Sequence, residues 1–174
     1  MVKVLEPAPT FKATAVVRKG EFESFDLADY EGSWVVLAFY PADFTTVCPT
    51  ELLELSRRAK EFAALNAEVV GISTDSKHSH KAWISMDLGE LSFPLVADPK
   101  KEISRAYGAL LEQEGVAARA TFLIDPAGVV QYASFHPPSV GRSVSEILRV
   151  LEGLQTGEYV PAEWSRGKPT LGRP

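Results

Sequence analysis

Residues 34–55, WVVLAFYPADFTTVCPTELLEL, place a short apolar run directly before a loop, a cysteine and a helical pattern. The run Trp34–Tyr40 is too short for a typical helix and is rich in strand formers, which predicts a strand covered on both faces. Glu54 and Arg58 are spaced to pair one turn apart on the exposed side of a helix. We expect one amphipathic helix here, because apolar residues recur at helical spacing: Leu52, Leu55, Ala59, Phe62 and Ala63.

The segments that follow repeat this order of strand and helix. Glu68–Ser73 is predicted to form the next strand, and a helix containing Ala82–Ile84 comes after it. This succession favours parallel strands joined by right-handed crossovers. The sequence therefore predicts an α/β fold.

The second half of the chain predicts a hairpin and a last helix. Thr121–Ile124 and Val129–Ala133 flank Asp125–Gly128, whose proline and glycine suit a type I turn, so an antiparallel hairpin is expected. An apolar stripe over residues 144–154 predicts the helix. The full order is that of a thioredoxin-like fold with a central mixed sheet flanked by helices, and residues 14–25 are expected to add an N-terminal hairpin.

Composition limits the function classes. With 174 residues and 45% hydrophobic content, we expect one domain over residues 1–160 and a polar, loosely held tail over residues 161–174. The formal charge of -5, without a block of Lys or Arg, argues against nucleic acid or a membrane surface as partner. The N-terminus lacks the apolar stretch of a signal peptide, so a soluble, cytoplasmic protein is expected.

Cys48 is the one cysteine and lies between the predicted strand and helix, where sites in parallel sheets gather. Pro49 suits a first helical position, which would place the sulfur beside unpaired backbone N–H groups that favour a thiolate. Thr45 could turn its hydroxyl toward the sulfur, and Pro41 could screen the sulfur from water. Arg119, just before a predicted strand, is our candidate for a fixed positive charge.

Other interpretations of these residues stay open. Cys48 could be a small buried hydrophobe, Thr45 a helix cap and Arg119 a surface cation. A disulfide oxidoreductase would need a second cysteine, and the chain has none.

The three histidines offer little support for other chemistry. A cysteine hydrolase would need a base near Cys48, but His78, His80 and His136 fall in predicted helix-start or loop regions with no evident path to it. His78 and His80 diverge on a helix and lack an acidic partner, so no metal site is predicted.

The spacing of Pro41, Thr45 and Cys48 resembles the Pro-x-x-x-Thr-x-x-Cys motif of peroxiredoxins, and residues 39–51 are similar to the typical two-cysteine branch that includes the peroxidase component of alkyl hydroperoxide reductase. This motif is highly specific. Similarity extends from Pro9 through the segments at residues 79–83, 93–98 and 119–125 to Val144, which is nearly the whole chain.

The resemblance implies a thiol peroxidase that reduces hydrogen peroxide and organic hydroperoxides without a cofactor or metal. Cys48 would be the peroxidatic cysteine and form a sulfenic acid, and Pro41, Thr45 and Arg119 match the remaining active-site positions. Glu51 and Arg142 resemble supporting residues that hold the arginine, although a surface ion pair is their ordinary alternative. The family also implies a homodimer, or a decamer built from dimers, and offers a chaperone-like holdase role as the alternative function.

The sequence departs from the family pattern at Val160, which occupies the position of the resolving cysteine. The usual disulfide between two copies of the chain cannot form. We expect an external thiol, thioredoxin-like or of low molecular weight, to reduce Cys48; the alternative is that the chain is a resolving-cysteine mutant of a two-cysteine enzyme. The short segment Asp87–Leu91 implies resistance to overoxidation, whereas a persistent sulfenic acid favours overoxidation, so the two effects oppose each other.

Overall fold

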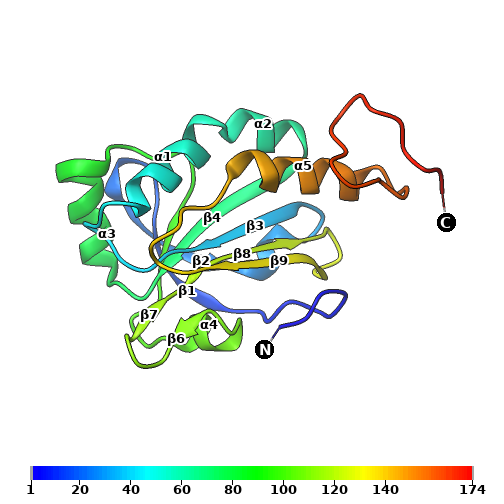
Figure 1. Ribbon diagram of the computed structural model, residues 1–174. Helices are drawn as coiled ribbons and strands as arrows, with labels where there is room; N and C mark the ends of the chain where they lie inside the picture. Colours follow the sequence, from blue (N-terminus) through cyan, green and yellow to red (C-terminus); the bar gives the residue numbers. More distant parts are fainter. Residues whose placement is uncertain (1, 174) are drawn as a thin grey trace. The chain divides into compact units, whose positions relative to one another are not determined.

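A computed structural model of the chain describes residues 2–173. The chain divides between Arg142 and Ser143 into two compact units. The first unit holds the sheet, and the second holds helix α5 and the C-terminal segment (Figure 1). No helix among the described residues is long and apolar enough to cross a bilayer.

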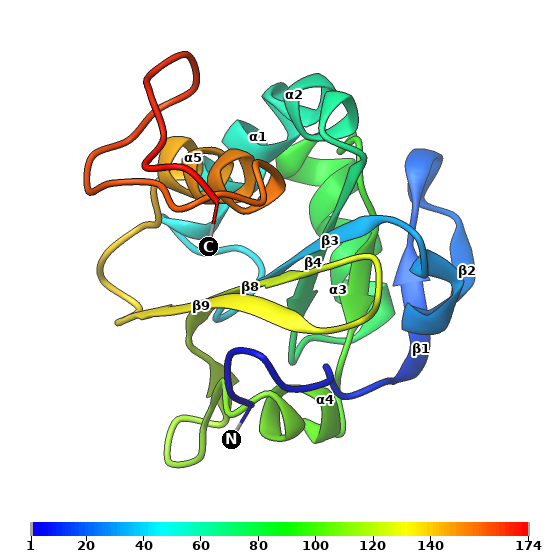
Figure 2. The ribbon, with the colours of Figure 1, turned by 90° about the vertical axis from the view of Figure 1, so that its right-hand side faces the viewer.

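Seven strands of the described residues form one mixed sheet in the order β2-β1-β5-β4-β3-β8-β9. Strands β3, β4 and β5 are parallel, and the other pairings are antiparallel. The predicted N-terminal hairpin is present and lies at the sheet edge remote from β9 (Figure 2). The strands are β1 (Lys12–Val16), β2 (Phe22–Asp26), β3 (Trp34–Phe39), β4 (Ala67–Ser73), β5 (Leu95–Ala97), β8 (Arg119–Ile124) and β9 (Val130–His136).

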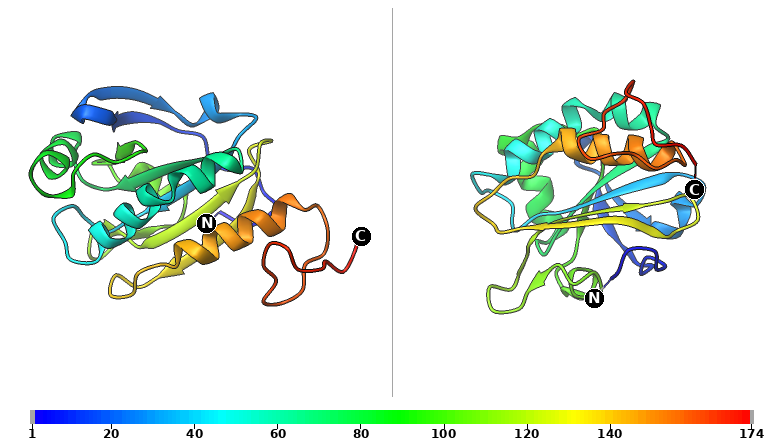
Figure 3. Two further views of the ribbon diagram at one scale, coloured as in Figure 1. Left: turned by 90° about the horizontal axis from the view of Figure 1, so that it is seen from above. Right: turned by 45° about the vertical axis from the view of Figure 1, so that its right-hand side comes forward.

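Helices of the first unit cover both faces of this sheet. Helices α1 and α2 lie on one face, and α4 lies on the other face near the small hairpin β6–β7 (Figures 1 and 3). The bounds are α1 (Cys48–Arg57), α2 (Ala59–Ala64), α3 (Lys77–Trp83), α4 (Glu102–Ala106), β6 (Leu110–Leu111) and β7 (Val116–Ala117). A π-helical turn, Ile84–Leu88, extends α3.

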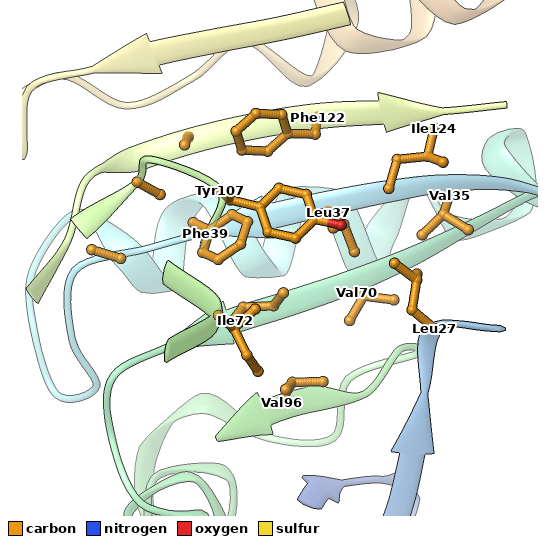
Figure 4. Packing of buried hydrophobic residues seen from close by; sticks show 14 of the residues in the cluster. Leu27, Val35, Leu37, Phe39, Val70, Ile72, Val96, Tyr107, Phe122 and Ile124 are labelled. Carbon is orange, nitrogen blue, oxygen red and sulfur yellow. The ribbon is translucent and has the colours of Figure 1, made fainter. Parts of the chain in front are cut away.

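The central strand β3 is buried on both faces, as its continuous apolar sequence predicts. Alternate side chains, Val35, Leu37 and Phe39, belong to one core cluster, because successive residues of a strand point to opposite faces. Tyr107 packs against Phe39 and Phe122 in this cluster, with ring centroids 5.4 and 5.0 Å away (Figure 4). The core therefore fixes β3 and β8 side by side, and these strands lead into the residues of the candidate site.

The predicted hairpin after the core is also present. Strands β8 and β9 pair antiparallel, and the N–H of Gly128 donates to the carbonyl of Asp125 at 2.9 Å to close the turn. Gly128 has a φ of 79°, a conformation that glycine adopts without a steric penalty. The Pro-Ala-Gly sequence of this turn is thus matched to its geometry.

The prediction of a single helix over residues 52–63 is wrong in one respect, because the helix is divided at Arg58. Arg58 has φ −96° and ψ 12°, so α1 ends at Arg57 and α2 begins at Ala59. Two hydrogen-bonded pairs are formed around the break: Arg57 donates to Glu54, at 2.7 and 2.6 Å, and Arg58 donates to Glu61 at 2.8 Å. The charges of Glu54 and Arg58 also attract each other, as their spacing predicted. The apolar spacing continues through the break, which is why the sequence did not indicate it.

The second unit contains α5 (Val144–Gln155), which is followed, among the described residues, by a segment without helix or strand. The Ser143 hydroxyl accepts the Glu146 N–H at 3.2 Å and caps the helix. Tyr159 forms backbone hydrogen bonds with Leu171 and Gly172, and the Trp164 indole N–H donates to the Lys168 carbonyl at 3.0 Å. These contacts give part of the C-terminal segment hydrogen bonds of its own.

Candidate active site

Cys48 is the first residue of α1 and follows the loop that leaves β3. Pro49 occupies the next helical position, as its fixed φ and missing N–H favour. The N–H groups of Thr50 and Glu51 both donate to the Val47 carbonyl, at 3.1 and 3.4 Å. The first turn therefore offers fewer unpaired N–H groups to the sulfur than the sequence suggested, and charge stabilisation must come mainly from side chains.

Arg119, the first residue of β8, supplies that charge. Its Nη1 lies 3.3 Å from Cys48 Sγ and 2.6 Å from Glu51 Oε2. The arginine is only 3% exposed, so its interaction with the sulfur is weakly screened by solvent. The alternative in which Arg119 is a surface cation is excluded by this burial.

Glu51 connects two arginines. Its Oε2 accepts from Arg119, and its Oε1 accepts from the backbone N–H and Nε of Arg142, at 2.7 and 3.0 Å. Burial alone would raise the pKa of Glu51, but hydrogen bonds from Arg142 and the charges of Arg142 and Arg119 hold it below the usual glutamate value. Glu51 and Arg142 are thus parts of a buried cluster, and the surface ion pair is excluded.

Arg142 is held from several sides. Its Nη1 donates to the Ala120 carbonyl at 3.0 Å and to Thr121 Oγ1 at 3.2 Å, and its Nη2 donates to the Phe39 carbonyl. The cluster therefore contains two buried positive charges and one negative charge, a net charge of +1. A buried excess of positive charge favours an anion beside it, and the sulfur of Cys48 is the nearby group able to become one.

The structure does not bring Thr45 into hydrogen-bond contact with the sulfur. The Thr45 hydroxyl donates to the Ala42 carbonyl at 3.0 Å, and its side chain is exposed. Its oxygen retains lone pairs and can accept a hydrogen bond. Pro41 is buried in the same loop, as expected of a residue that limits the access of water.

Cys48 itself has no exposed surface. The sulfur is therefore closed to solvent in this conformation. The side chains of Arg119 and Glu51 are buried together with the sulfur at the helix start. All three side chains are at most 3% exposed.

A buried cluster of three polar side chains, Tyr40, Asp43 and His80, was not predicted from the sequence. Tyr40 donates its hydroxyl to Asp43 Oδ1 at 2.8 Å, and His80 Nδ1 lies 2.8 Å from Asp43 Oδ2. His80 Nε2 lies 3.2 Å from the Val96 carbonyl. Both ring nitrogens of His80 are thus engaged away from Cys48, so the histidine supports the loop through Asp43 and is not a base for the cysteine. An aspartate within an otherwise apolar and hydroxyl-bearing loop was the one signal for this group.

Burial raises the pKa of Tyr40 well above its usual value, and the negative charge of Asp43 acts in the same direction. The phenol therefore keeps its proton and remains a donor to Asp43. This bond anchors the loop five residues before Cys48.

A thiol against a buried guanidinium at a helix start, on a thioredoxin-like sheet, defines the class of thiol-dependent redox proteins. The model of the AhpC/TSA family matches residues 4–133. The chain therefore belongs to the AhpC/TSA family, the family of the peroxiredoxins, as the sequence motifs predicted.

Individual relatives agree with this assignment. The chain is 49% identical to "Peroxiredoxin tpx1" of Schizosaccharomyces pombe, over 98% of this chain and 93% of that protein. It is 47% identical to "Thioredoxin peroxidase" of Fasciola hepatica, over 95% of this chain and 89% of the relative.

Solved structures show the same fold. A reduced 2-Cys peroxiredoxin of Plasmodium vivax superposes with a TM-score of 0.94 at 37% identity, covering 97% of this chain and 92% of the other. AhpC of Enterococcus faecalis superposes with a TM-score of 0.86 at 35% identity, covering 90% of this chain and 94% of the other. The thioredoxin-like fold is confirmed, and with a single cysteine the chain lacks the resolving cysteine.

Proposed function

We propose that this chain is a thiol peroxidase in which Cys48 reduces hydrogen peroxide and organic hydroperoxides. The observation that carries the proposal is the 3.3 Å approach of Arg119 Nη1 to Cys48 Sγ inside a buried cluster. Because that cluster has a net charge of +1, it favours the thiolate, which is the attacking form of cysteine.

The chemical step is a displacement at oxygen. The thiolate attacks the terminal oxygen of the hydroperoxide, so an S–O bond forms while the O–O bond breaks. Cys48 is oxidised to a sulfenic acid, and the peroxide is reduced to an alkoxide or hydroxide that takes a proton from water. Negative charge moves from sulfur to the leaving oxygen, where a donor that is already in place lowers the barrier.

Arg119 can supply such a donor. A guanidinium has five N–H groups. The N–H of Nε and one N–H of Nη2 donate to the Pro138 carbonyl, and Nη1 donates to Glu51 and Cys48. One N–H on Nη2 has no acceptor among the described residues and would donate to a peroxide oxygen.

Thr45 and Pro41 would complete the pocket. Because the Thr45 hydroxyl proton is directed to Ala42, its oxygen is the group that would accept the O–H of the peroxide. Pro41 offers no N–H, so it would not compete for the substrate. Since Cys48 is fully buried, peroxide can reach the sulfur only after a change of conformation that exposes it.

An external thiol would close the cycle. It attacks the sulfenic sulfur and releases water to give a mixed disulfide, and a second thiol then restores Cys48 and leaves as part of a disulfide. Val160 cannot take this role, because valine has no thiol. A thioredoxin-like protein or a low-molecular-weight thiol is the proposed reductant.

A homodimer, or a decamer built from dimers, is the proposed assembly. Strand β9 ends the order of the sheet, and Phe135 on it is 45% exposed. An edge strand leaves backbone N–H and C=O groups free to pair with a second copy. Size-exclusion chromatography with light scattering should give a dimer or a multiple of dimers, and a strict monomer at micromolar concentration would contradict the assembly.

The enzymatic proposal is tested with Cys48→Ser. The wild-type chain should consume hydrogen peroxide in the presence of dithiothreitol, and the variant should lose this consumption because serine is a far weaker nucleophile. Circular dichroism should show the same fold in both. Unchanged peroxide consumption by the variant would reject Cys48 as the nucleophile.

A further inference from the structure

The loop of residues 137–142, named here the anchoring loop, contacts two residues of the active-site cluster, Arg119 and Glu51. The Pro138 carbonyl accepts from Arg119 Nε at 2.9 Å and from Nη2 at 2.7 Å. Four residues later, the Arg142 N–H and guanidinium bind Glu51. One short segment therefore sets the position of both Arg119 and its carboxylate partner.

The double contact to Pro138 fixes the orientation of the guanidinium. Nε and Nη2 share one edge of the planar group, and the Pro138 carbonyl lies at that edge. With this edge fixed, Nη1 can face only the opposite side, where it meets Cys48 and Glu51. A single hydrogen bond would leave the guanidinium free to rotate, whereas two hydrogen bonds from one edge to the same oxygen limit its direction.

The sequence of the loop makes this carbonyl rigid. Residues Pro137–Val140 form a turn that the Val140 N–H closes by donating to the Pro137 carbonyl at 3.1 Å. Pro138 is at the second position of this turn, where the fixed φ of proline is favourable. Two adjacent prolines thus restrict the backbone directly before and at the carbonyl that Arg119 uses.

The far end of the loop is held by close packing. A Cβ placed on Gly141 would lie 3.4 Å from Val47 and 3.7 Å from Glu51. The backbone at Gly141 therefore lies directly against the start of α1. Pro138 is exposed, so its ring contributes little to the core, and its effect is local.

We propose that Pro138 is a positioning residue for the peroxidase reaction: its ring holds the carbonyl that aims Arg119 at the sulfur of Cys48. The proposal rests on the proposed function. It predicts that a freer backbone at this point weakens the contact of Arg119 with sulfur without unfolding the protein.

The test compares Pro138→Gly with Pro126→Gly in the full-length chain. Pro126 is a matched control, because it is exposed at the second position of a closed turn and its carbonyl accepts the Gly32 N–H at 3.0 Å. Three quantities are measured: the second-order rate constant with hydrogen peroxide, the pH dependence of Cys48 alkylation by iodoacetamide, and the exchange rate of the Val140 amide.

Pro138→Gly should lower the peroxide rate constant about tenfold, as small misplacements of a catalytic group do. It should also shift the alkylation profile to higher pH and speed exchange at Val140. Pro126→Gly should change none of the three, and Pro138→Ala should fall between wild type and Pro138→Gly.

An unchanged rate and profile in Pro138→Gly, equal losses in both glycine variants, or a Val140 amide that stays protected would each overturn the proposal. A wild-type chain that does not react with peroxide would instead reject the proposed function. The alkylation profile still reports on the contact of Arg119 with sulfur in that case, so the two failures are distinguishable.

Discussion

At the scale of single residues, Arg119 is the side chain of the buried cluster that contacts the sulfur. It reaches the sulfur of Cys48, the carboxylate of Glu51 and the Pro138 carbonyl with one planar group. A lysine has the same charge but lacks the fork that allows these directions at once. The chemistry of the site therefore depends on geometry as much as on charge.

Arg119→Lys should lower the rate constant of Cys48 with hydrogen peroxide by about 10²-fold, the lower end of the range seen when one oxyanion donor is lost. Stopped-flow mixing under single-turnover conditions measures it. Lys12→Arg, at a side chain paired with Asp26 on the surface, serves as the control and should leave the rate unchanged. A full rate in Arg119→Lys would mean that charge alone is sufficient.

Glu51→Gln should destabilise the protein at pH 7 by about 3 to 5 kcal/mol, because one partner of a buried charge cluster is lost. The pKa of Glu51 is lowered by folding, so its contribution is present above the ordinary carboxyl value of 4.5 and is lost as pH falls through the lower folded value. Urea unfolding at several pH values measures this. The difference between wild type and variant should shrink in acid, and a difference that grows on acidification would contradict the assignment.

The sequence predicted Cys48, Arg119, Glu51 and Arg142 as site residues because the motifs of a known family carry them, and the structure brings these four side chains together. The group of Tyr40, Asp43 and His80 was missed for a physical reason. His80 lies 37 residues from Asp43, and the contact depends on how α3 packs beside the loop, which no local pattern records.

At the scale of elements, strands and helices with a long periodic pattern were predicted, and short ones were not. Strand β3, with six residues, and α5, with twelve, have clear patterns. Strand β5 has three residues, α4 five and β6 two, which is too short for any period to show. The break at Arg58 was also missed, because Leu55 and Phe62 keep helical spacing across it.

The contact of β4 with α1 gives a prediction at this scale. A Cβ on Gly71 would lie 2.6 Å from Leu95 Cδ2 and 3.6 Å from Leu52 Cδ2, and both leucines are fully buried. Gly71→Ala should therefore cost about 1 to 3 kcal/mol of unfolding free energy through overpacking. Urea denaturation at pH 7 measures the loss.

Leu95→Val removes the atom that this methyl group would meet. The double variant Gly71→Ala/Leu95→Val should be more stable than the sum of the two single effects predicts, because the two changes relieve one clash. Simple additivity would show that strain at Gly71 has another source.

At the scale of the whole molecule, the single cysteine determines the catalytic cycle. Oxidised Cys48 has no second thiol in its own chain or in an identical copy other than another Cys48. The sulfenic acid should therefore persist until an external thiol arrives, and turnover should depend on the concentration of that thiol.

Val160→Cys should replace this dependence on an external thiol with a disulfide between two copies of the chain. By the resemblance to two-cysteine enzymes, position 160 corresponds to the resolving cysteine, so oxidation of the variant should yield a disulfide-linked dimer on a non-reducing gel. The wild type should remain monomeric on the same gel. No disulfide in the variant would mean that residue 160 does not take the position that the sequence pattern assigns to it.

The central claim is that the sulfur of Cys48 takes one oxygen atom from a peroxide. Intact-mass and peptide mass spectrometry after one equivalent of hydrogen peroxide, with dimedone present to trap sulfenic acid, tests it most directly. The account predicts dimedone-labelled Cys48 in proportion to the peroxide consumed. Consumption of the whole equivalent with Cys48 unmodified would contradict it.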